Sequence, residues 1–218
     1  MSATPCQRPS SIPRGAPIGS VPWVAARTAR AALGLIVLIG LTIQATGAFA
    51  QPVEAFFDRS AAAMRDVDAA TPGAPLHAAC TSQVEASFDL PVLARAVAGP
   101  EIWASFGETR QPVFIAALRA RLAAECVRSR RGGTLTPLST RMTDAGASMT
   151  VRLTLPDGAE RVLVWRLKAG GPWGWQASDL IADGFSLTTA LSDEVRGAFD
   201  ALGGNAAIAA LARGASLR

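Results

Sequence analysis

The residues with the clearest chemical potential in this sequence are its one histidine and a serine near its C-terminal third. His77 lies in APLHAAC, where no zinc-type ligand spacing surrounds it, so we expect a structural or surface histidine. Ser186 follows Gly184 in DGFSL, which lacks the G-x-S-x-G context of a nucleophile elbow. We therefore expect Ser186 to cap a helix rather than to attack a substrate.

Asp179 is the strongest candidate for a catalytic group, because it lies among apolar residues in the stretch WGWQASDLIADGFSLTTAL, residues 173–191. A buried carboxylate can act as a general base, as in small cone-shaped isomerases, or it can pair with a strand arginine or accept backbone hydrogen bonds. We favour a structural role, since the chain contains no tyrosine to donate a hydrogen bond to an oxyanion. The sequence shows no P-loop and no dinucleotide fingerprint, so we expect neither an enzyme nor a cofactor.

The first 50 residues have the three parts of a secretory signal peptide. Four arginines precede an apolar run at residues 31–43, and no acidic residue lies in the first 50 residues. The small-x-small triplet Ala48-Phe49-Ala50 follows the run. The apolar run is shorter than the about 20 residues that a membrane span needs, although an uncleaved anchor is the alternative. We therefore predict a signal peptide at residues 1–50 and one exported domain at residues 51–218.

The charge balance of the chain changes once this segment is set aside. The whole chain has a net charge of +4, but four of its 21 basic residues and none of its 17 acidic residues lie in the first 50. The predicted domain is therefore near neutral, and the short run Arg128, Arg130 and Arg131 does not make the clustered basic face of a nucleic-acid-binding protein. We expect no nucleic-acid partner.

Cys80 and Cys126 are the two cysteines of the predicted domain. An exported chain meets an oxidising compartment, in which two such cysteines tend to join, and the bridge would close a loop of about 47 residues. No C-x-x-C motif or His/Cys cluster points to zinc or to thioredoxin-like redox chemistry. We predict a disulfide, with two free buried thiols as the alternative.

The elements that must position these residues follow from the hydrophobic periodicity, which changes along the domain from about 3.6 to 2 residues. Helices are predicted at residues 52–70, 75–87, 88–99 and 109–130, strands at 134–143, 148–155, 160–168 and 173–182, and helices again at 186–202 and 205–213. Ser186 and Asn205 are the expected N-caps of the last two helices. This order predicts an α+β fold, in which N-terminal and C-terminal helices pack on a curved antiparallel sheet of about four strands.

The apolar side chains of these helices and of one sheet face form either an ordinary packed core or the wall of a cavity. Periodicity alone favours the packed core. The candidate wall residues are Phe88, Leu93, Val97, Ile102, Trp103, Phe106, Phe114, Leu118, Leu122, Val151, Leu153, Leu163, Trp165, Leu167, Trp175, Ala177, Ile181 and Phe185.

Several short motifs, in their order and spacing, resemble the MlaC-type family, the periplasmic phospholipid-binding components of toluene-tolerance or lipid-asymmetry ABC transport systems. The family's ending runs Gly-Trp-Lys, then an aspartate, then Glu-Gly-Val-Ser-Leu. In this sequence Gly174-Trp175-Gln176, Asp179 and residues 183–187 occupy those places. Upstream, FDLPVLARAVAGPEIW at residues 88–103 resembles the family's Phe-Asp, short helix, glycine and aromatic residue.

This resemblance implies a nuclear-transport-factor-like cone of sheet and helices that encloses a pocket for acyl chains, with the wall residues in contact with lipid. The implied ligand is a phospholipid or a related two-chain lipid, with a hopanoid as an alternative. The implied location is the periplasm, and the implied partners are an inner-membrane MCE-domain ABC transporter and an outer-membrane lipoprotein complex. A cone-fold enzyme that uses Asp179, and a ligand-free periplasmic interaction protein, are the competing hypotheses.

Overall fold

The computed structural model describes residues 52–129 and 132–214, and the predicted signal peptide lies outside these ranges. The elements are α1 (Val53–Ala69), α2 (Ala74–Ser87), α3 (Leu90–Ser129), β1 (Thr134–Thr143), β2 (Gly146–Thr154), β3 (Glu160–Ala169), β4 (Trp175–Ala182), β5 (Phe185–Ser186), α4 (Leu187–Leu202) and α5 (Gly204–Ala212). This order confirms the predicted α+β class. No helix in the described ranges combines the length and the apolar character that crossing a membrane requires.

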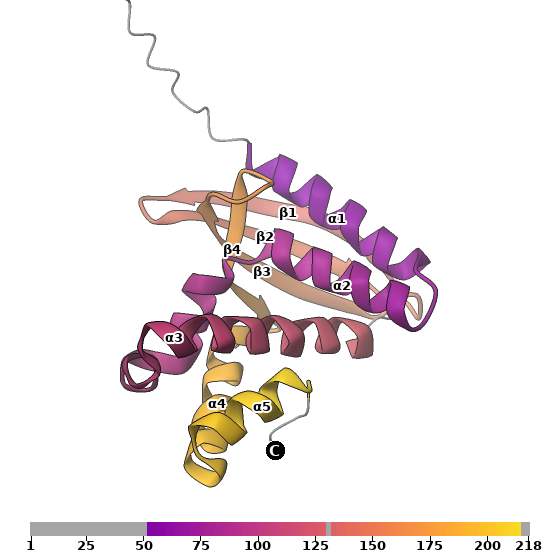
Figure 1. Cartoon of the computed structure of the whole chain (residues 1–218). Coiled ribbons are helices and arrows are strands. Elements are labelled where there is room, and N and C mark those ends of the chain that lie inside the picture. Colours follow the sequence, from indigo (N-terminus) through magenta and orange to yellow (C-terminus); the bar gives the residue numbers. More distant parts are fainter. Residues whose placement is uncertain (1–51, 130–131, 215–218) are drawn as a thin grey trace, which may run out of the picture. The chain divides into compact units, whose positions relative to one another are not determined.

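The strands form one curved antiparallel sheet in the order β1-β2-β3-β4-β5. Four strands were expected, and the fifth is the two-residue β5, which pairs with the end of β4. In Figure 1, α1 and α2 lie in front of the sheet, the long part of α3 runs below them, and α4 and α5 follow the end of β4. The side chains on the helix-facing side of the sheet therefore meet α1, α2 and α3.

Helix α3 bends sharply at two glycines, where the sequence predicts a break between two helices. Gly99 has φ 70° and ψ 168°, and Gly107 has φ 57° and ψ −179°. Positive φ with extended ψ is accessible mainly to glycine, because any other residue would place its Cβ against the backbone. The two bends separate a short helical segment, residues 100–106, from the long segment that carries Phe114 and Leu118 into the core.

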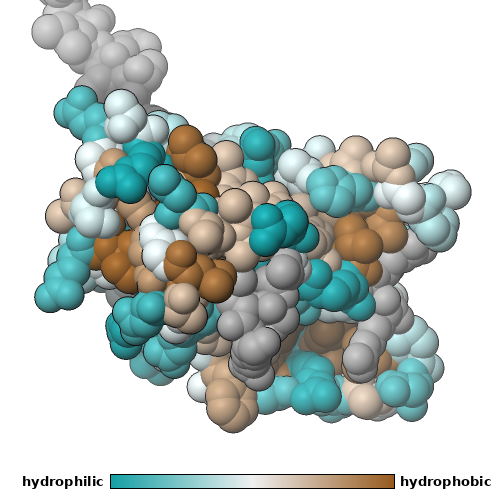
Figure 2. Space-filling model, turned by 60° about the horizontal axis from the view of Figure 1, so that its bottom comes forward, coloured by the Kyte–Doolittle hydropathy of each residue, from teal (hydrophilic) through white to brown (hydrophobic). Residues whose placement is uncertain are grey.

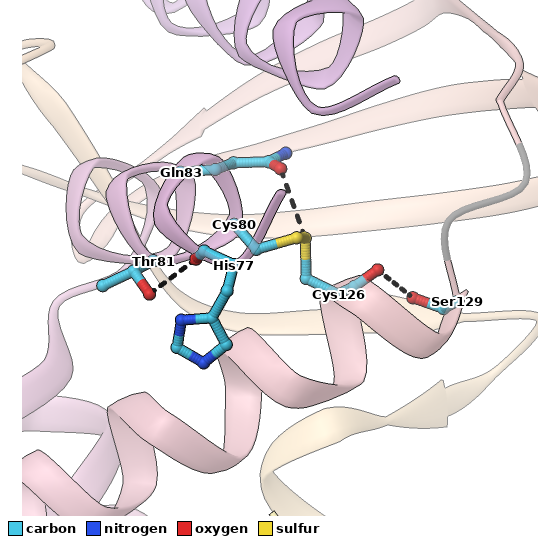
Figure 3. Close-up of a disulfide and its surroundings, with 6 residues drawn as sticks. All are labelled: His77, Cys80, Thr81, Gln83, Cys126 and Ser129. Carbon is cyan, nitrogen blue, oxygen red and sulfur yellow. Dashed lines mark hydrogen bonds between the residues drawn. A yellow bond between two sulfur atoms is a disulfide. The ribbon is translucent and has the colours of Figure 1, made fainter. Parts of the chain in front are cut away.

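A disulfide joins α2 to α3, as the cysteine count predicts. The Cα atoms of Cys80 and Cys126 are 5.8 Å apart, and the bridge lies beside a small second core of Val67, Leu76 and Ala123. His77 lies one helical turn before Cys80, is exposed, and points its imidazole away from the sulfur atoms (Figure 3). The position of the imidazole agrees with a surface histidine.

The two predicted helix caps have different outcomes. The Ser186 hydroxyl accepts a hydrogen bond from the backbone N–H of Thr189 at 3.2 Å, so Ser186 caps α4 as expected. Helix α5 instead begins one residue before Asn205, with Gly203 at φ 76° in the N-cap position and no capping side chain. The prediction for Asn205 is therefore wrong, because the glycine pair turns the chain before the asparagine is reached.

Candidate functional site

One hydrophobic core fills the space between the sheet and the helices. Two-thirds of the predicted wall residues are buried in it, namely Phe88, Leu93, Val97, Phe106, Phe114, Leu118, Leu122, Val151, Trp165, Leu167, Trp175 and Ala177. Ile102, Trp103 and Leu163 are partly buried and pack against it. The structure therefore brings residues from the three segments of α3, from the chain just before it, and from three strands to one site.

Aromatic side chains gather at two ends of this core. Trp165 of β3 contacts Phe56 and Phe88, with ring centroids 5.6 and 5.8 Å apart. At the other end, Phe106 lies 4.9 Å from Phe114 and 5.5 Å from Phe199 of α4. Edge-on and tilted pairs at these distances add about 0.5–1.5 kcal/mol each beyond the apolar area that they bury. The same core contains aliphatic side chains, among them Leu93, Leu118 and Leu122.

The middle of the core is tightly closed in this structure. Leu93, Phe114, Leu118 and Ala177 have no exposed surface. A side chain without accessible surface touches neither solvent nor an internal void that is large enough for water. These residues therefore pack against one another, and an acyl chain can lie among them only if the sheet and the helices move apart.

A β-bulge decides which residues of β4 face the core. Leu167 pairs with Ala177, but the preceding Arg166 pairs with Asp179, so Ser178 is an extra residue in β4. Trp175 and Ala177 face the core before the bulge, and Leu180 faces it afterwards, opposite Trp165. The prediction of Ile181 as a wall residue is therefore wrong, since Ile181 lies opposite Val164 on the other face of the sheet.

Two further predicted wall residues lie outside the buried core. Phe185 is 80% exposed and lines a surface depression of about 620 Å³ beside α4, so its assignment to the wall is corrected. The tight turn at Asp183 and Gly184, both at positive φ, directs the chain outward at this point. Leu153 is half-buried near the end of β2, opposite Leu135, and thus lies at the margin of the core.

Several core residues were missed by the sequence reasoning. Phe56 of α1 is 1% exposed, and Met149 of β2 is also 1% exposed. Met149 continues the alternation of Val151 and Leu153, so period-2 patterning alone was enough to find it. On α4, Leu187, Leu191, Val195 and Phe199 recur every four residues and pack on the same core. The Phe56 signal is weaker, because Phe57 follows it directly and only the fold decides which ring points inward.

Asp179 serves as an anchor between β4 and α4. Its carboxylate accepts hydrogen bonds from the backbone N–H of Leu180 and Thr188, at 2.9 and 3.0 Å. It also accepts from the hydroxyls of Ser186 and Thr188, at 2.9 and 2.8 Å. The carboxylate is buried, and three of its four hydrogen bonds come from residues at the N-terminus of α4. The helix dipole makes a negative charge favourable at that end. This arrangement matches the structural role that the sequence favours.

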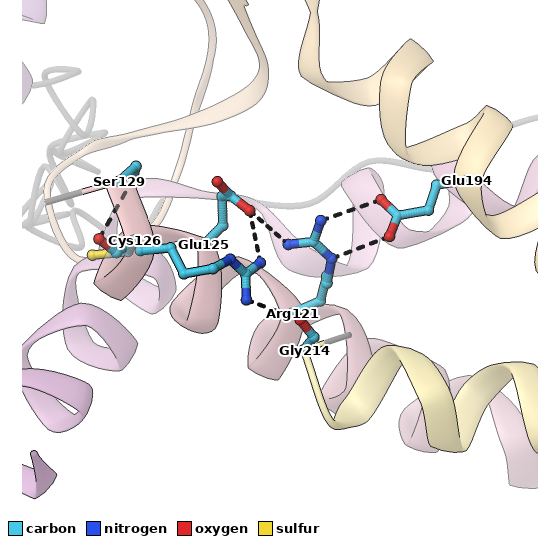
Figure 4. A network of polar contacts seen from close by, with 7 residues as sticks. Arg121, Glu125, Cys126, Ser129, Glu194 and Gly214 are labelled. Carbon is cyan, nitrogen blue, oxygen red and sulfur yellow. Dashed lines mark hydrogen bonds and ion pairs between the residues drawn. The ribbon is translucent and has the colours of Figure 1, made fainter. Parts of the chain in front are cut away.

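A buried ion pair connects α3 to α4 (Figure 4). Arg121 contacts Glu194 at 3.3 Å and Glu125 at 2.9 Å, and Arg128 contacts Glu125 at 2.7 Å. Burial lowers the pKa of Arg121, but the two carboxylates outweigh this effect and the pKa lies above its usual value. The hydrogen bond from Arg128 holds the pKa of Glu125 below its usual value, against the opposing effect of burial and with the help of Arg121. Glu125 thus stabilises the fold above the pKa of its unfolded form, and this contribution is lost as pH falls through the folded pKa.

The sequence profile described as "MlaC protein" matches residues 54–213, which is most of the chain. This chain belongs to the MlaC family. The match confirms the resemblance that the motifs around Phe88 and Trp175 predict. A search of the curated proteins found no match.

Among solved structures, this MlaC-family chain is similar to a phospholipid-binding protein from Ralstonia solanacearum, determined in complex with a phospholipid at 1.53 Å resolution. The TM-score is 0.59 at 16% sequence identity, over 76% of this chain and 96% of the other. At this identity the likeness shows that the two proteins share a fold.

Proposed function

We propose that this protein is a periplasmic carrier that binds a phospholipid or a related two-chain lipid. We further propose that it serves an ABC-type transport system between the inner and outer membranes, docking to an MCE-domain transporter complex and to an outer-membrane lipoprotein complex. Membership of the MlaC family carries the proposal. The phospholipid bound to the solved protein of the same fold supports the ligand class.

The proposed binding place is the hydrophobic core between the sheet and the helices. Its walls are apolar, so each lipid methylene that leaves water for the core contributes about 0.8 kcal/mol. Opening the core without a ligand would expose Leu93, Leu118 and Trp165 to water, whereas opening it around acyl chains keeps them covered. The closed packing and the lipid-filled form thus bury the same protein surface, and the net gain comes from the lipid.

The polar contacts of the sheet with the helices indicate how the core would open. Asp89 donates its backbone N–H to the Ala177 carbonyl at 3.0 Å, and the Gln176 amide donates to the Phe88 carbonyl at 3.1 Å. These bonds tie β4 to the chain between α2 and α3. Trp165, one strand further, meets the helices through ring contacts with Phe56 and Phe88. Apolar contacts are non-directional and acyl chains can replace them, whereas the hydrogen bonds at β4 would lose their partners. We therefore propose that β1–β3 swing away from the helices about β4 as lipid enters.

The test is lipid capture by the purified mature protein. Protein isolated from the periplasm of a Gram-negative host is examined by native mass spectrometry, and stripped protein is then mixed with vesicles that contain labelled phospholipid. We expect a bound two-chain lipid and its uptake from vesicles. Asp179→Asn should retain both, because the role of the Asp179 carboxylate is to anchor α4 rather than to bind lipid. An empty protein that takes up no labelled phospholipid would refute the carrier function, and lipid turnover that Asp179→Asn abolishes would favour the enzyme.

A further inference from the structure

Two buried serine hydroxyls have no hydrogen-bond partner within the described part of the chain. Ser60 of α1 is 3% exposed and Ser87 of α2 is 1% exposed, and the Oγ atom of each is fully covered by protein. Many polar side chains of this protein lie at the surface, and Figure 2 shows such hydrophilic residues in teal across one face. Water can satisfy the surface groups, whereas bulk water does not reach Ser60 and Ser87.

An unpaired hydroxyl is unusual inside a helix, because a serine or threonine can donate to the backbone carbonyl one turn earlier. Thr81 of α2 does so, since its hydroxyl donates to the His77 carbonyl at 2.9 Å. Ser60 and Ser87 make no such bond in the described chain. Buried polar groups are nearly always paired, since an unpaired one has lost its hydration without compensation. Each hydroxyl therefore destabilises the closed protein, and a ligand group that accepts a hydrogen bond would remove this cost.

Both serines lie next to the aromatic end of the proposed lipid-binding core. Ser60 is one helical turn after Phe56 on the buried face of α1. Ser87 immediately precedes Phe88 at the end of α2. The rings of Phe56 and Phe88 both contact Trp165, with centroids 5.6 and 5.8 Å away. The two hydroxyls are thus placed where β3 meets α1 and α2, which is the boundary that opens in the proposed binding motion.

The α1–α2 hairpin brings the two serines to a similar height. In Figure 1 the two helices run side by side in front of the sheet, and residues 70–73 connect them. At a rise of 1.5 Å per residue, Ser60 lies about 14 Å and Ser87 about 20 Å from that connection. The two positions therefore differ by only about 6 Å along the hairpin.

We propose that Ser60 and Ser87 donate hydrogen bonds to the ester carbonyl oxygens of a diacyl glycerolipid that enters the core. The proposal rests on the carrier function and narrows its ligand class. A serine hydroxyl is a donor and an ester carbonyl is an acceptor, so the two groups match. The two ester carbonyls of such a lipid belong to chains on neighbouring glycerol carbons, which suits two donors at a similar height. A hopanoid, whose polycyclic hydrocarbon body has no such pair of carbonyls, would leave both hydroxyls unpaired.

The test compares two lipids that differ only in these carbonyls. Stripped mature protein is mixed with vesicles that contain equal amounts of dioleoyl-phosphatidylglycerol and of its di-O-oleyl ether counterpart, and the captured lipids are measured by native mass spectrometry. We expect the wild-type protein to favour the diester at least about fivefold, because each hydrogen bond contributes modestly to binding. Ser60→Ala and Ser87→Ala should each reduce this preference, and the double variant should capture the two lipids almost equally.

The same substitutions are expected to stabilise the lipid-free protein. Removing an unpaired buried hydroxyl should raise the thermal midpoint by about 2–4 °C for each serine. Ser82→Ala is the matched control, because Ser82 is an exposed serine of α2 and its replacement reports the helix preference for alanine alone. A gain in stability together with a loss of diester preference distinguishes ligand-binding hydroxyls from structural ones.

The outcomes separate this proposal from the carrier function. Equal capture of the diester and the diether by the wild-type protein would overturn ester recognition and leave the carrier function intact. Capture of neither lipid would refute the carrier function and this proposal with it. A diester preference that survives in the double variant, or a lower thermal midpoint of lipid-free Ser60→Ala and Ser87→Ala than of Ser82→Ala, would overturn the assigned role of the two serines.

Discussion

Replacement of Cys80 and Cys126 together by alanine is expected to lower the free energy of unfolding by about 4 kcal/mol, the largest stability effect that we predict. The bridge spans 46 residues of sequence and joins α2 to the long segment of α3. Without it the unfolded chain gains the freedom of that loop, and the small core at Val67 and Leu76 loses its covalent support. Urea unfolding monitored by tryptophan fluorescence gives the value directly.

The control for this prediction is the wild-type protein unfolded under a strong reductant. Reduction should lower its stability by nearly the same amount as the double substitution, and the reductant should leave the alanine variant unchanged. Two cysteines that react with an alkylating agent in freshly isolated periplasmic protein, or a stability loss below about 1 kcal/mol, would contradict the structural bridge.

Ala177→Trp is expected to reduce phospholipid occupancy at least about tenfold while the protein still unfolds cooperatively. Ala177 has no exposed surface and faces the same side of β4 as Trp175, against Leu167. An indole at this position fills more space than two lipid methylenes, so the lipid loses at least about 1.6 kcal/mol, which is roughly a tenfold loss of affinity. Because the core must open for lipid, it can also open for the indole, at a stability cost of about 1–3 kcal/mol.

Val162→Trp is the control, since Val162 is exposed on the neighbouring strand β3 and lies on the sheet face away from the core. It should retain both lipid and stability. Lipid occupancy is measured by native mass spectrometry and stability by thermal unfolding. An Ala177→Trp protein that keeps its full lipid content would show that the acyl chains do not reach this wall, and one that cannot fold would show a core that does not open.

The sequence was informative wherever a regular period or a local turn signal controls the structure. The period-2 runs in β2 and β3 and the four-residue spacing of apolar residues in the helices place most of the core, including Leu118 and Trp165. Ser186 and Asp179 also have the structural roles that their neighbours predict. These features depend on contacts within a few residues or on a repeating pattern, which a single sequence displays.

The errors arise where a long-range contact or one extra residue decides the outcome. A single bulge residue, Ser178, moves Ile181 to the sheet face away from the core, and the local alternation of apolar and polar residues does not predict this bulge. The turn at Asp183 and Gly184 exposes Phe185, although its hydrophobicity predicts burial. Hydrophobic periodicity likewise cannot distinguish a solid core from a lipid-binding core, because both bury the same apolar faces of the helices and strands.

Photo-crosslinking can show whether lipid acyl chains enter the core between the sheet and the helices. The stripped protein is loaded with a phospholipid that carries a diazirine near the middle of one acyl chain, irradiated and digested, and the labelled peptides are identified by mass spectrometry. We expect labels on the segments that carry Leu93, Leu118 and Trp165, and we expect Ala177→Trp to lose them. Labels confined to α5 or to the sheet face that carries Ile181 would contradict this binding place.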